Sequence, residues 1–101
     1  MGILIHHERS LGAVTALGTW STNTVRLHGL LMQIVVKHTT STTEYDFALI
    51  NDQNEVILNR TDIVGTINEE VGTPIKGVYT MRLQNSTRDE AFDIALIIQE
   101  R

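Results

Sequence analysis

The sequence predicts an all-β fold, an antiparallel β-sandwich of jelly-roll or Ig-like type with seven to eight short strands. Two observations predict it: apolar and polar residues alternate with a period of two in several segments, and turn-forming residues recur at roughly ten-residue intervals. The same period excludes a helix bundle, and the β-branched and aromatic residues of these segments favour strands. With 101 residues, the chain has room for one hydrophobic core and therefore for a single domain.

The N-terminal part of the chain contains two weak strand candidates, residues 3–7 and 13–17. Ile3, Leu4 and Ile5 are consecutive, so both faces of the first strand are apolar and both need to be covered. We therefore expect this N-terminal part to contact neighbouring subunits.

Residues 25–38 form a long strand whose apolar pattern changes phase. Val25 and Leu27 share one parity, whereas the later apolar residues share the other. These later residues are Leu30, Met32, Ile34 and Val36. A slip of one residue turns every later side chain to the opposite face, so we expect an interruption near Gly29, glycine being a usual site of a β-bulge. The apolar face of residues 30–36 is expected to lie in the core.

A run of five hydroxyl residues, Thr39-Thr40-Ser41-Thr42-Thr43, follows this strand. A phosphate site would need glycines and a following helix, and an O-glycan tether would need secretion and usually prolines. The run is therefore interpreted as the bend between two strands. We expect its tip, Thr40, Ser41 and Thr42, to be exposed and able to hydrogen-bond a neighbouring subunit.

Three segments show the clearest alternation: residues 44–50, 75–83 and 92–98. Their expected core-facing residues are Tyr45, Phe47 and Leu49, then Ile75, Gly77, Tyr79, Met81 and Leu83, then Phe92, Ile94, Leu96 and Ile98. The polar turn at residues 51–54 predicts a hairpin that leads into a short strand at residues 56–58.

Residues 59–73 mix two glycines with isolated apolar residues, so they are interpreted as a loop that holds one further strand at residues 64–68. Carboxylate pairs occur at Glu69-Glu70 and Asp89-Glu90, each flanked by residues of predicted loops. General acid–base catalysis needs a pair whose surroundings separate the two pKa values, and no apolar setting is evident here. Both pairs are therefore interpreted as solvated loop charge.

The residue types that catalysis or metal binding would need are missing or badly spaced. Cysteine is absent, and His6 and His7 are adjacent, so in a strand they point to opposite faces and cannot readily bind one ion. No nucleophile elbow and no glycine-rich phosphate loop is present. We predict that the protein is not an enzyme and that it has no catalytic residues, no cofactor and no metal site.

Charge and hydropathy narrow the possible partners. The formal net charge is −4 and no basic cluster occurs, which argues against nucleic acid as a partner. The N-terminus MGILIHHERS lacks the features of a signal peptide, and the longest apolar segment, residues 27–36, is far shorter than the roughly 20 residues that span a bilayer. We therefore expect no membrane partner and a soluble protein that is made in a cytoplasm and acts there or in something assembled there.

The order of elements from residue 25 to residue 99 resembles that of small β-sandwich structural proteins encoded by tailed bacteriophages. The features that carry the resemblance are the long apolar strand, the Thr/Ser bend, Tyr45-Asp46-Phe47, the polar turn, Gly77-Val78-Tyr79-Thr80, and Asn85-Ser86-Thr87-Arg88-Asp89-Glu90-Ala91-Phe92-Asp93-Ile94. They form a pattern of strands and turns and contain no catalytic signature.

The resemblance implies a non-enzymatic virion component, localised in the virion and assembled in the host cytoplasm. It would be a capsid cement or decoration protein or, alternatively, a neck or tail fitting. Its implied partners are itself, as a homo-oligomer and most often a trimer, and the major capsid protein or neck and tail proteins. Residues 1–24 lie outside the resemblance and are interpreted as an N-terminal arm with the first strand or strands, whereas residues 25–101 form the sandwich core. Within the arm, residues 1–17 would contact other subunits or the capsid.

A different class of function, a soluble carbohydrate-binding β-sandwich, would need exposed aromatic rings around a concave site. Four of the five aromatic residues fall on predicted core faces, which leaves Trp20. Trp20 would act either as a contact anchor or as a plug that closes one end of the sandwich. The predicted interface residues are Ile3, Leu4, Ile5, Trp20, Thr40, Ser41 and Thr42.

Overall fold

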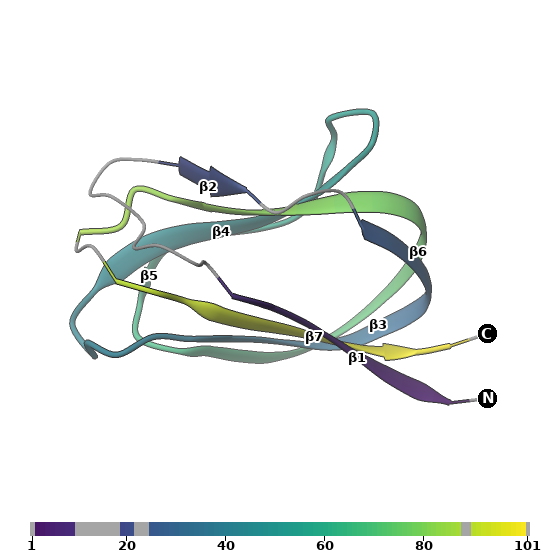
Figure 1. The fold of residues 1–101 in the computed structure, drawn as a ribbon, viewed down its shortest axis with the longest axis horizontal. Coiled ribbons are helices and arrows are strands. Elements are labelled where there is room, and N and C mark those ends of the chain that lie inside the picture. Colours follow the sequence, from purple (N-terminus) through teal and green to yellow (C-terminus); the bar gives the residue numbers. More distant parts are fainter. Residues whose placement is uncertain (1, 10–18, 22–24, 88–89, 101) are drawn as a thin grey trace.

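The structure is a computed structural model that describes residues 2–9, 19–21, 25–87 and 90–100 (Figure 1). These residues form seven strands, and every pairing between them is antiparallel. The strands are β1 (Ile3–Arg9), β2 (Thr19–Ser21), β3 (Val25–Lys37), β4 (Glu44–Asn51), β5 (Val56–Val64), β6 (Ile67–Gln84) and β7 (Asp93–Gln99). The prediction of an all-β antiparallel fold is confirmed. The described part of the chain contains no helix that is long and apolar enough to cross a membrane.

One continuous sheet contains all the strands, in the order β1-β7-β3-β6-β4-β5, with β2 also paired to β6. The 18-residue β6 organises this sheet, because residues 67–79 pair with β3 whereas residues 79–84 pair with β4. β2 pairs with residues 82–84, on the side of β6 opposite to β4. In Figure 1, β6 curves round one end of the molecule, with β3, β7 and β1 below and β2 and β4 above. We call β1-β7-β3 and the first part of β6 the first half-sheet, and β2, the last part of β6, β4 and β5 the second half-sheet.

The core contains the residues that the three clearest alternating segments predicted, except Gly77, which is half-buried. Tyr45, Phe47 and Leu49 of β4 are fully buried, as are Met81 and Leu83 of β6. The same holds at the C-terminus, where the buried residues are Phe92, Ile94, Leu96 and Ile98. The polar turn at residues 51–54 is also confirmed: the Asn51 side-chain oxygen accepts backbone N–H bonds from Gln53 (3.0 Å) and Glu55 (2.9 Å) and so holds the hairpin between β4 and β5.

The phase change in β3 is real, but the predicted position near Gly29 is wrong. The register against both β6 and β7 shifts between Leu31 and Gln33. Leu31 is therefore in the core, whereas Leu30 is half-buried and Met32 is 36% exposed. The prediction that the apolar face of residues 30–36 is core thus holds only for Ile34 and Val36. Apolar spacing alone shows that one residue is extra, but the neighbouring strands decide where the ladder accommodates it.

The loop predicted for residues 59–73 is also wrong. β5 continues to Val64, a tight turn contains Gly65, and β6 begins at Ile67, so the predicted strand at residues 64–68 spans a turn. Most side chains of this segment are exposed or half-buried, so its strands depend on backbone pairing and lack strong apolar alternation. The predicted strand at residues 13–17 lies outside the described residues.

Candidate functional site

Strand β1 forms one edge of the sheet and exposes apolar side chains at its first three residues. It pairs along its whole length with β7, without a register shift, and its other side is paired with no described strand. Ile3 is 56%, Leu4 38% and Ile5 53% exposed. The consecutive apolar residues noted in the sequence therefore lie uncovered on an open sheet edge, where burial by a partner would be favourable.

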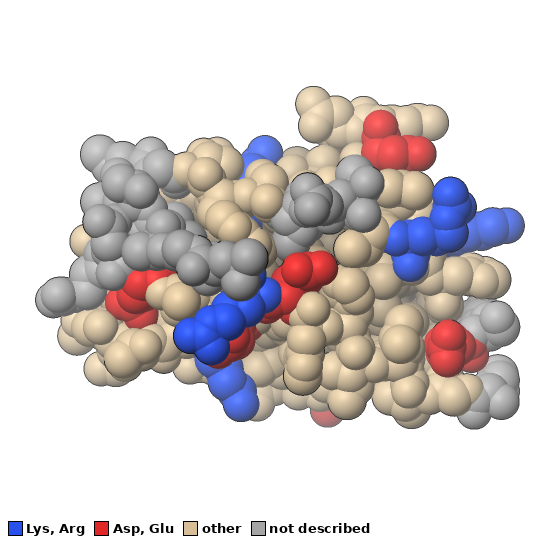
Figure 2. Space-filling model, viewed as in Figure 1, with Lys and Arg blue, Asp and Glu red and all other residues tan. Residues whose placement is uncertain are grey.

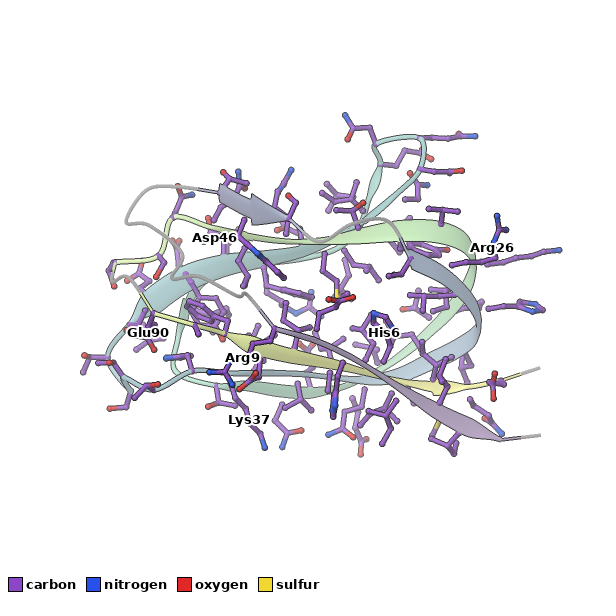
Figure 3. The ribbon with its side chains drawn as sticks, viewed as in Figure 1. His6, Arg9, Arg26, Lys37, Asp46 and Glu90 are labelled. Atoms are coloured by element: carbon purple, nitrogen blue, oxygen red, sulfur yellow. The ribbon has the colours of Figure 1, made fainter. Side chains whose placement is uncertain are left out.

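A shallow groove of about 500 Å³ runs beside β1 on the face of the first half-sheet that points away from the core. Its apolar floor comes from three neighbouring strands, with Ile5 on β1, Ile97 on β7 and Val35 on β3. Arg9 and Lys37 line the same groove and lie near each other in Figure 3. The groove thus combines an apolar floor with a charged end, which Glu8 and Asp93 also line, and this is the composition of a protein-binding surface with a polar rim.

The charged end of the groove is partly neutralised. Arg9 Nη1 lies 3.5 Å from Asp93 Oδ1, and both side chains are more than half exposed, so this ion pair contributes little to stability. In the view of Figure 2, charged groups form separate clusters and most of the surface between them is uncharged.

A second polar cluster is buried where the hydroxyl run meets the segment before β7. The Glu90 carboxylate, 9% exposed, accepts hydrogen bonds from the backbone N–H groups of Thr39 (2.7 Å) and Thr40 (3.0 Å). It also accepts bonds from Thr43 Oγ1 (2.7 Å) and from His38 Nδ1 (3.0 Å). The hydroxyl run is thus an anion-binding bend, as a phosphate cradle would be, but the anion that it holds is the protein's own carboxylate.

His38 completes this cluster from the core side. Its side chain is 1% exposed and its ring lies 5.2 Å from the rings of both Tyr45 and Phe92, measured between centroids. Because the ionised carboxylate of Glu90 can only accept, Nδ1 of His38 carries the donated hydrogen. Nε2 is buried without a hydrogen-bond partner among the described residues. The cluster joins residues that are about 50 positions apart in the chain, and its two ionisable side chains are almost completely buried, so we assign it a structural role.

The interpretation of Glu90 as solvated loop charge is therefore wrong. Burial opposes ionisation of Glu90, but the hydrogen bonds from Thr40, Thr43, Thr39 and His38 outweigh it and lower the pKa of Glu90 to about 2. The physical reason is that four donors stabilise the charged form, and none of them adjoins Glu90 in the sequence. Glu69 also differs from the prediction, because it accepts two bonds from Arg60 (2.7 and 2.6 Å), which lower its pKa.

The pKa of Glu90 leads to an expected pH dependence of stability. The pKa is about 2 in the folded protein and 4.5 without these contacts, so the unfolded chain binds a proton first as the pH falls. The stabilisation is thus fully present above pH 4.5 and is lost as the pH falls towards 2. Urea unfolding between pH 6 and pH 2.5 should show this loss in the wild type, and a smaller loss in Glu90→Gln. Equal slopes for the two proteins would contradict the assignment.

The other predicted interface residues lie away from β1. Ser41 and Thr42 are exposed at the tip of the bend, whereas Thr40 is half-buried and its backbone N–H is used by Glu90. Trp20 of β2 is half-buried against the core. The structure therefore places Ile3, Leu4 and Ile5 on one exposed edge strand, with Leu4 on the opposite face from Ile3 and Ile5, but does not join them to Trp20 or to the hydroxyl run. The sequence did not predict that Val35 and Ile97 form part of the groove beside β1, although the alternating pattern predicted the strands that contain them, β3 and β7.

The histidines and aromatic rings do not form a ligand site in the described part of the chain. No group of three or more His, Asp or Glu side chains there is placed to hold a metal ion. His6 and His7 face different partners, with His6 3.0 Å from Glu8 and His7 on the groove. The aromatic side chains of β4, β6 and the segment before β7 are buried, so none of them offers a stacking face to a sugar. These are Tyr45, Phe47, Tyr79 and Phe92.

A scan against protein-family models found no match, and a search of curated proteins found none either.

Proposed function

We propose that this protein is a non-enzymatic structural protein of a tailed-phage virion that binds neighbouring subunits through the β1 edge and the groove beside it. The observation that carries the proposal is the exposure of Ile3, Leu4 and Ile5 on an unpaired sheet edge, next to a groove floored by Ile97 and Val35. An apolar surface at a sheet edge is typical of proteins that act by assembly. The role as capsid cement or decoration protein rests on the resemblance in strand and turn order.

We also propose that the fold is a jelly roll. A jelly roll has eight strands in two four-stranded sheets and recurs in viral capsid proteins. The two half-sheets, β1-β7-β3-β6 and β2-β6-β4-β5, give this number if the long β6 counts as two strands joined without a loop. The two would otherwise be separated near Tyr79, where β6 passes from β3 to β4, and Gly77, with a φ of 123°, lies two residues before this point. This topology favours the jelly roll over the Ig-like alternative and supports a virion role.

The chemistry of the described residues supports a binding role. The Glu90 carboxylate, 9% exposed, is held by four donors, one of which is His38, so neither residue is free to transfer protons to a substrate. No specific observation favours the carbohydrate-binding alternative, because Trp20, the aromatic residue left to contact a sugar, packs against the core. The alternative of a neck or tail fitting uses the same surface and differs only in the particle component that is bound.

Particles of the encoding phage that lack this protein test the function. If it is a cement protein, they should assemble but lose heat and osmotic-shock resistance, and purified wild-type protein should restore that resistance. Ile97→Glu, which places a charge on the groove floor, should bind such particles at least about tenfold more weakly, because the carboxylate would be desolvated in the contact. Val56→Glu on β5, where the native residue is 49% exposed, is the matched control and should restore resistance fully.

Two outcomes separate the alternatives. Heads that fill but do not join tails when the protein is absent would favour the neck or tail role. Particles that are unchanged in stability and infectivity without the protein would contradict a virion role altogether.

A further inference from the structure

The edges of the sheet differ in how they are protected against pairing. β5, at the far end from β1, has register shifts at two places against β4, and Asp62 adopts a positive φ of 54° there. The Asp62 N–H is held by Asp46 Oδ1 at 2.8 Å, which keeps this bulge in place. β2 has only three residues. Bulges, charges and short length are the usual means by which proteins block unwanted strand pairing.

β1 has none of these protections over its first residues. It is seven residues long and regular, and Ile3, Leu4 and Ile5 include no charge and no proline. The contrast with β5 is informative because both strands belong to the same sheet. An edge that is left open while the opposite edge is blocked indicates a strand that has a partner.

The backbone of β1 shows which groups a partner would meet. The Glu100 N–H donates to the Gly2 carbonyl oxygen (2.9 Å), so Gly2 directs its backbone groups towards the strand beside it. Because consecutive residues of an antiparallel strand direct these groups to opposite sides, Leu4 also faces β7, whereas Ile3 and Ile5 face the open edge. The free N–H and C=O groups thus lie on the same residues that carry the exposed apolar side chains.

We propose that the partner of β1 is β1 of a second copy of this chain, paired antiparallel about a two-fold axis at Leu4. In this register Ile3 lies opposite Ile5 of the partner subunit, and Ile5 lies opposite Ile3 of the partner subunit. Both pairs are on the groove side of the sheet. Leu4 lies opposite Leu4 of the partner subunit on the core side. Ile3 and Ile5 exchange four backbone hydrogen bonds with their counterparts, the four isoleucine side chains contact one another on the groove side, and the two Leu4 side chains contact each other on the core side.

Other registers pair these residues less well. An axis at Ile5 places Ile3 opposite His7 and Leu4 opposite His6, and an axis at His6 places Ile3 opposite Arg9. The axis at Leu4 also keeps the Arg9 side chains of the two copies at opposite ends of the ribbon, which avoids repulsion between them. Apolar matching and charge separation thus select the same register.

The pairing joins two first half-sheets into one continuous sheet, with both grooves on the same outer face. This inference rests on the proposed function and makes it more specific, because it identifies a second copy of the chain as the partner of β1. The two grooves remain available to bind another virion component. The pairing gives a two-fold pair in place of the trimer that the phage resemblance implies.

Disulfide formation between single-cysteine variants tests the register, because the wild-type chain contains no cysteine. Leu4 forms a non-hydrogen-bonded pair with its counterpart, with Cα atoms roughly 4.5 Å apart, so Leu4→Cys should form a disulfide-linked dimer under mild oxidation. His6→Cys is the control, since its Cα lies roughly 13 Å from its counterpart, beyond disulfide reach. Failure of Leu4→Cys to link, or faster linking by His6→Cys, would overturn the register.

Sedimentation of the 101-residue chain tests the pair itself. The wild type should have the mass of two chains at micromolar concentration, and Ile5→Lys should weaken the pair by roughly tenfold or more, because it places a cation among the apolar contacts. Val56→Lys on the protected β5 edge should leave the mass unchanged. Circular dichroism should give the same β-rich spectrum for each variant as for the wild type, as a check that the variants are folded. A wild type that sediments as a monomer or a trimer overturns the pairing.

Different measurements would contradict the pairing and the proposed function. If the wild type is a monomer but still restores particle resistance, the pairing is wrong and the function stands. If the pair forms and links at residue 4 but the particles are unaffected by its absence, the pairing stands and the virion role is wrong.

Discussion

Replacing Gly29 by alanine is expected to lower the free energy of unfolding by about 3 kcal/mol or more. Gly29 lies in the middle of β3 with a φ of 142°, a conformation that L side chains rarely adopt. A Cβ at this position would lie 2.2 Å from the backbone oxygen of Gln99 and 3.0 Å from Ile98 Cγ2. A backbone oxygen in a paired strand cannot move aside cheaply, so β3 and β7 would have to separate. Urea unfolding at neutral pH measures the loss.

Gly72→Ala is the matched control for this substitution. Gly72 lies in β6 with no heavy atom within 4 Å of an added Cβ, and its φ is ordinary. Its replacement should change the free energy of unfolding by less than about 0.5 kcal/mol. If Gly29→Ala were as stable as Gly72→Ala, the close approach of β3 to the end of β7 would be wrong.

Replacing Glu90 by glutamine is expected to lower the free energy of unfolding by about 2–3 kcal/mol, because hydrogen bonds to a charged, buried acceptor are lost or weakened. An amide keeps one acceptor oxygen, but it places an NH₂ group where the second carboxylate oxygen accepts from Thr43 Oγ1. The backbone N–H groups of Thr39 and Thr40 also lose a charged partner. The bend between β3 and β4 should therefore loosen first, and amide hydrogen exchange at Thr39 and Thr40 should increase.

Glu70→Gln on the exposed side of β6 is the control for the loss of charge. It removes the same charge from a protein of net charge −4 and should change stability by less than about 0.5 kcal/mol. Equal effects of the two substitutions would mean that net charge alone, and not the cluster around Glu90, is responsible.

The strands with strict alternation could be predicted because that signal is local. In β7 every buried residue lies between exposed or half-buried neighbours, and β4 alternates in the same way up to Phe47. Residues 47–50 are all buried, and the sequence there is apolar throughout. The turn at Asn51 was also predictable, because a side chain that caps its own backbone needs no distant partner. These elements follow from residues within one strand or one turn.

The elements that were missed depend on distant residues. Residues 59–73 are mostly polar, and they are strands because β4 and β3 offer backbone partners. The bulge in β3 lies at residue 32 and not near Gly29, because β6 and β7 must shift register together with it. In the sequence, Glu90 has the surroundings of a loop charge. Its donors come from residues 38–43, about 50 residues earlier in the chain, and only the folded structure brings them to it.

The candidate site also has one part that the sequence predicts and one part that depends on the tertiary structure. Three consecutive apolar residues, Ile3, Leu4 and Ile5, already indicate a strand that needs cover on both faces, because alternation assigns one of each two neighbours to each face. That the strand is an open edge, with Ile97 and Val35 beside it, depends on the strand order, in which β7 comes between β1 and β3. Side-chain periodicity is a property of single segments, whereas edges, grooves and buried ion clusters arise only where segments meet. The amino-acid sequence alone therefore specifies the all-β class and the unusual apolar strand, and tertiary pairing decides which side of that strand remains open to a partner.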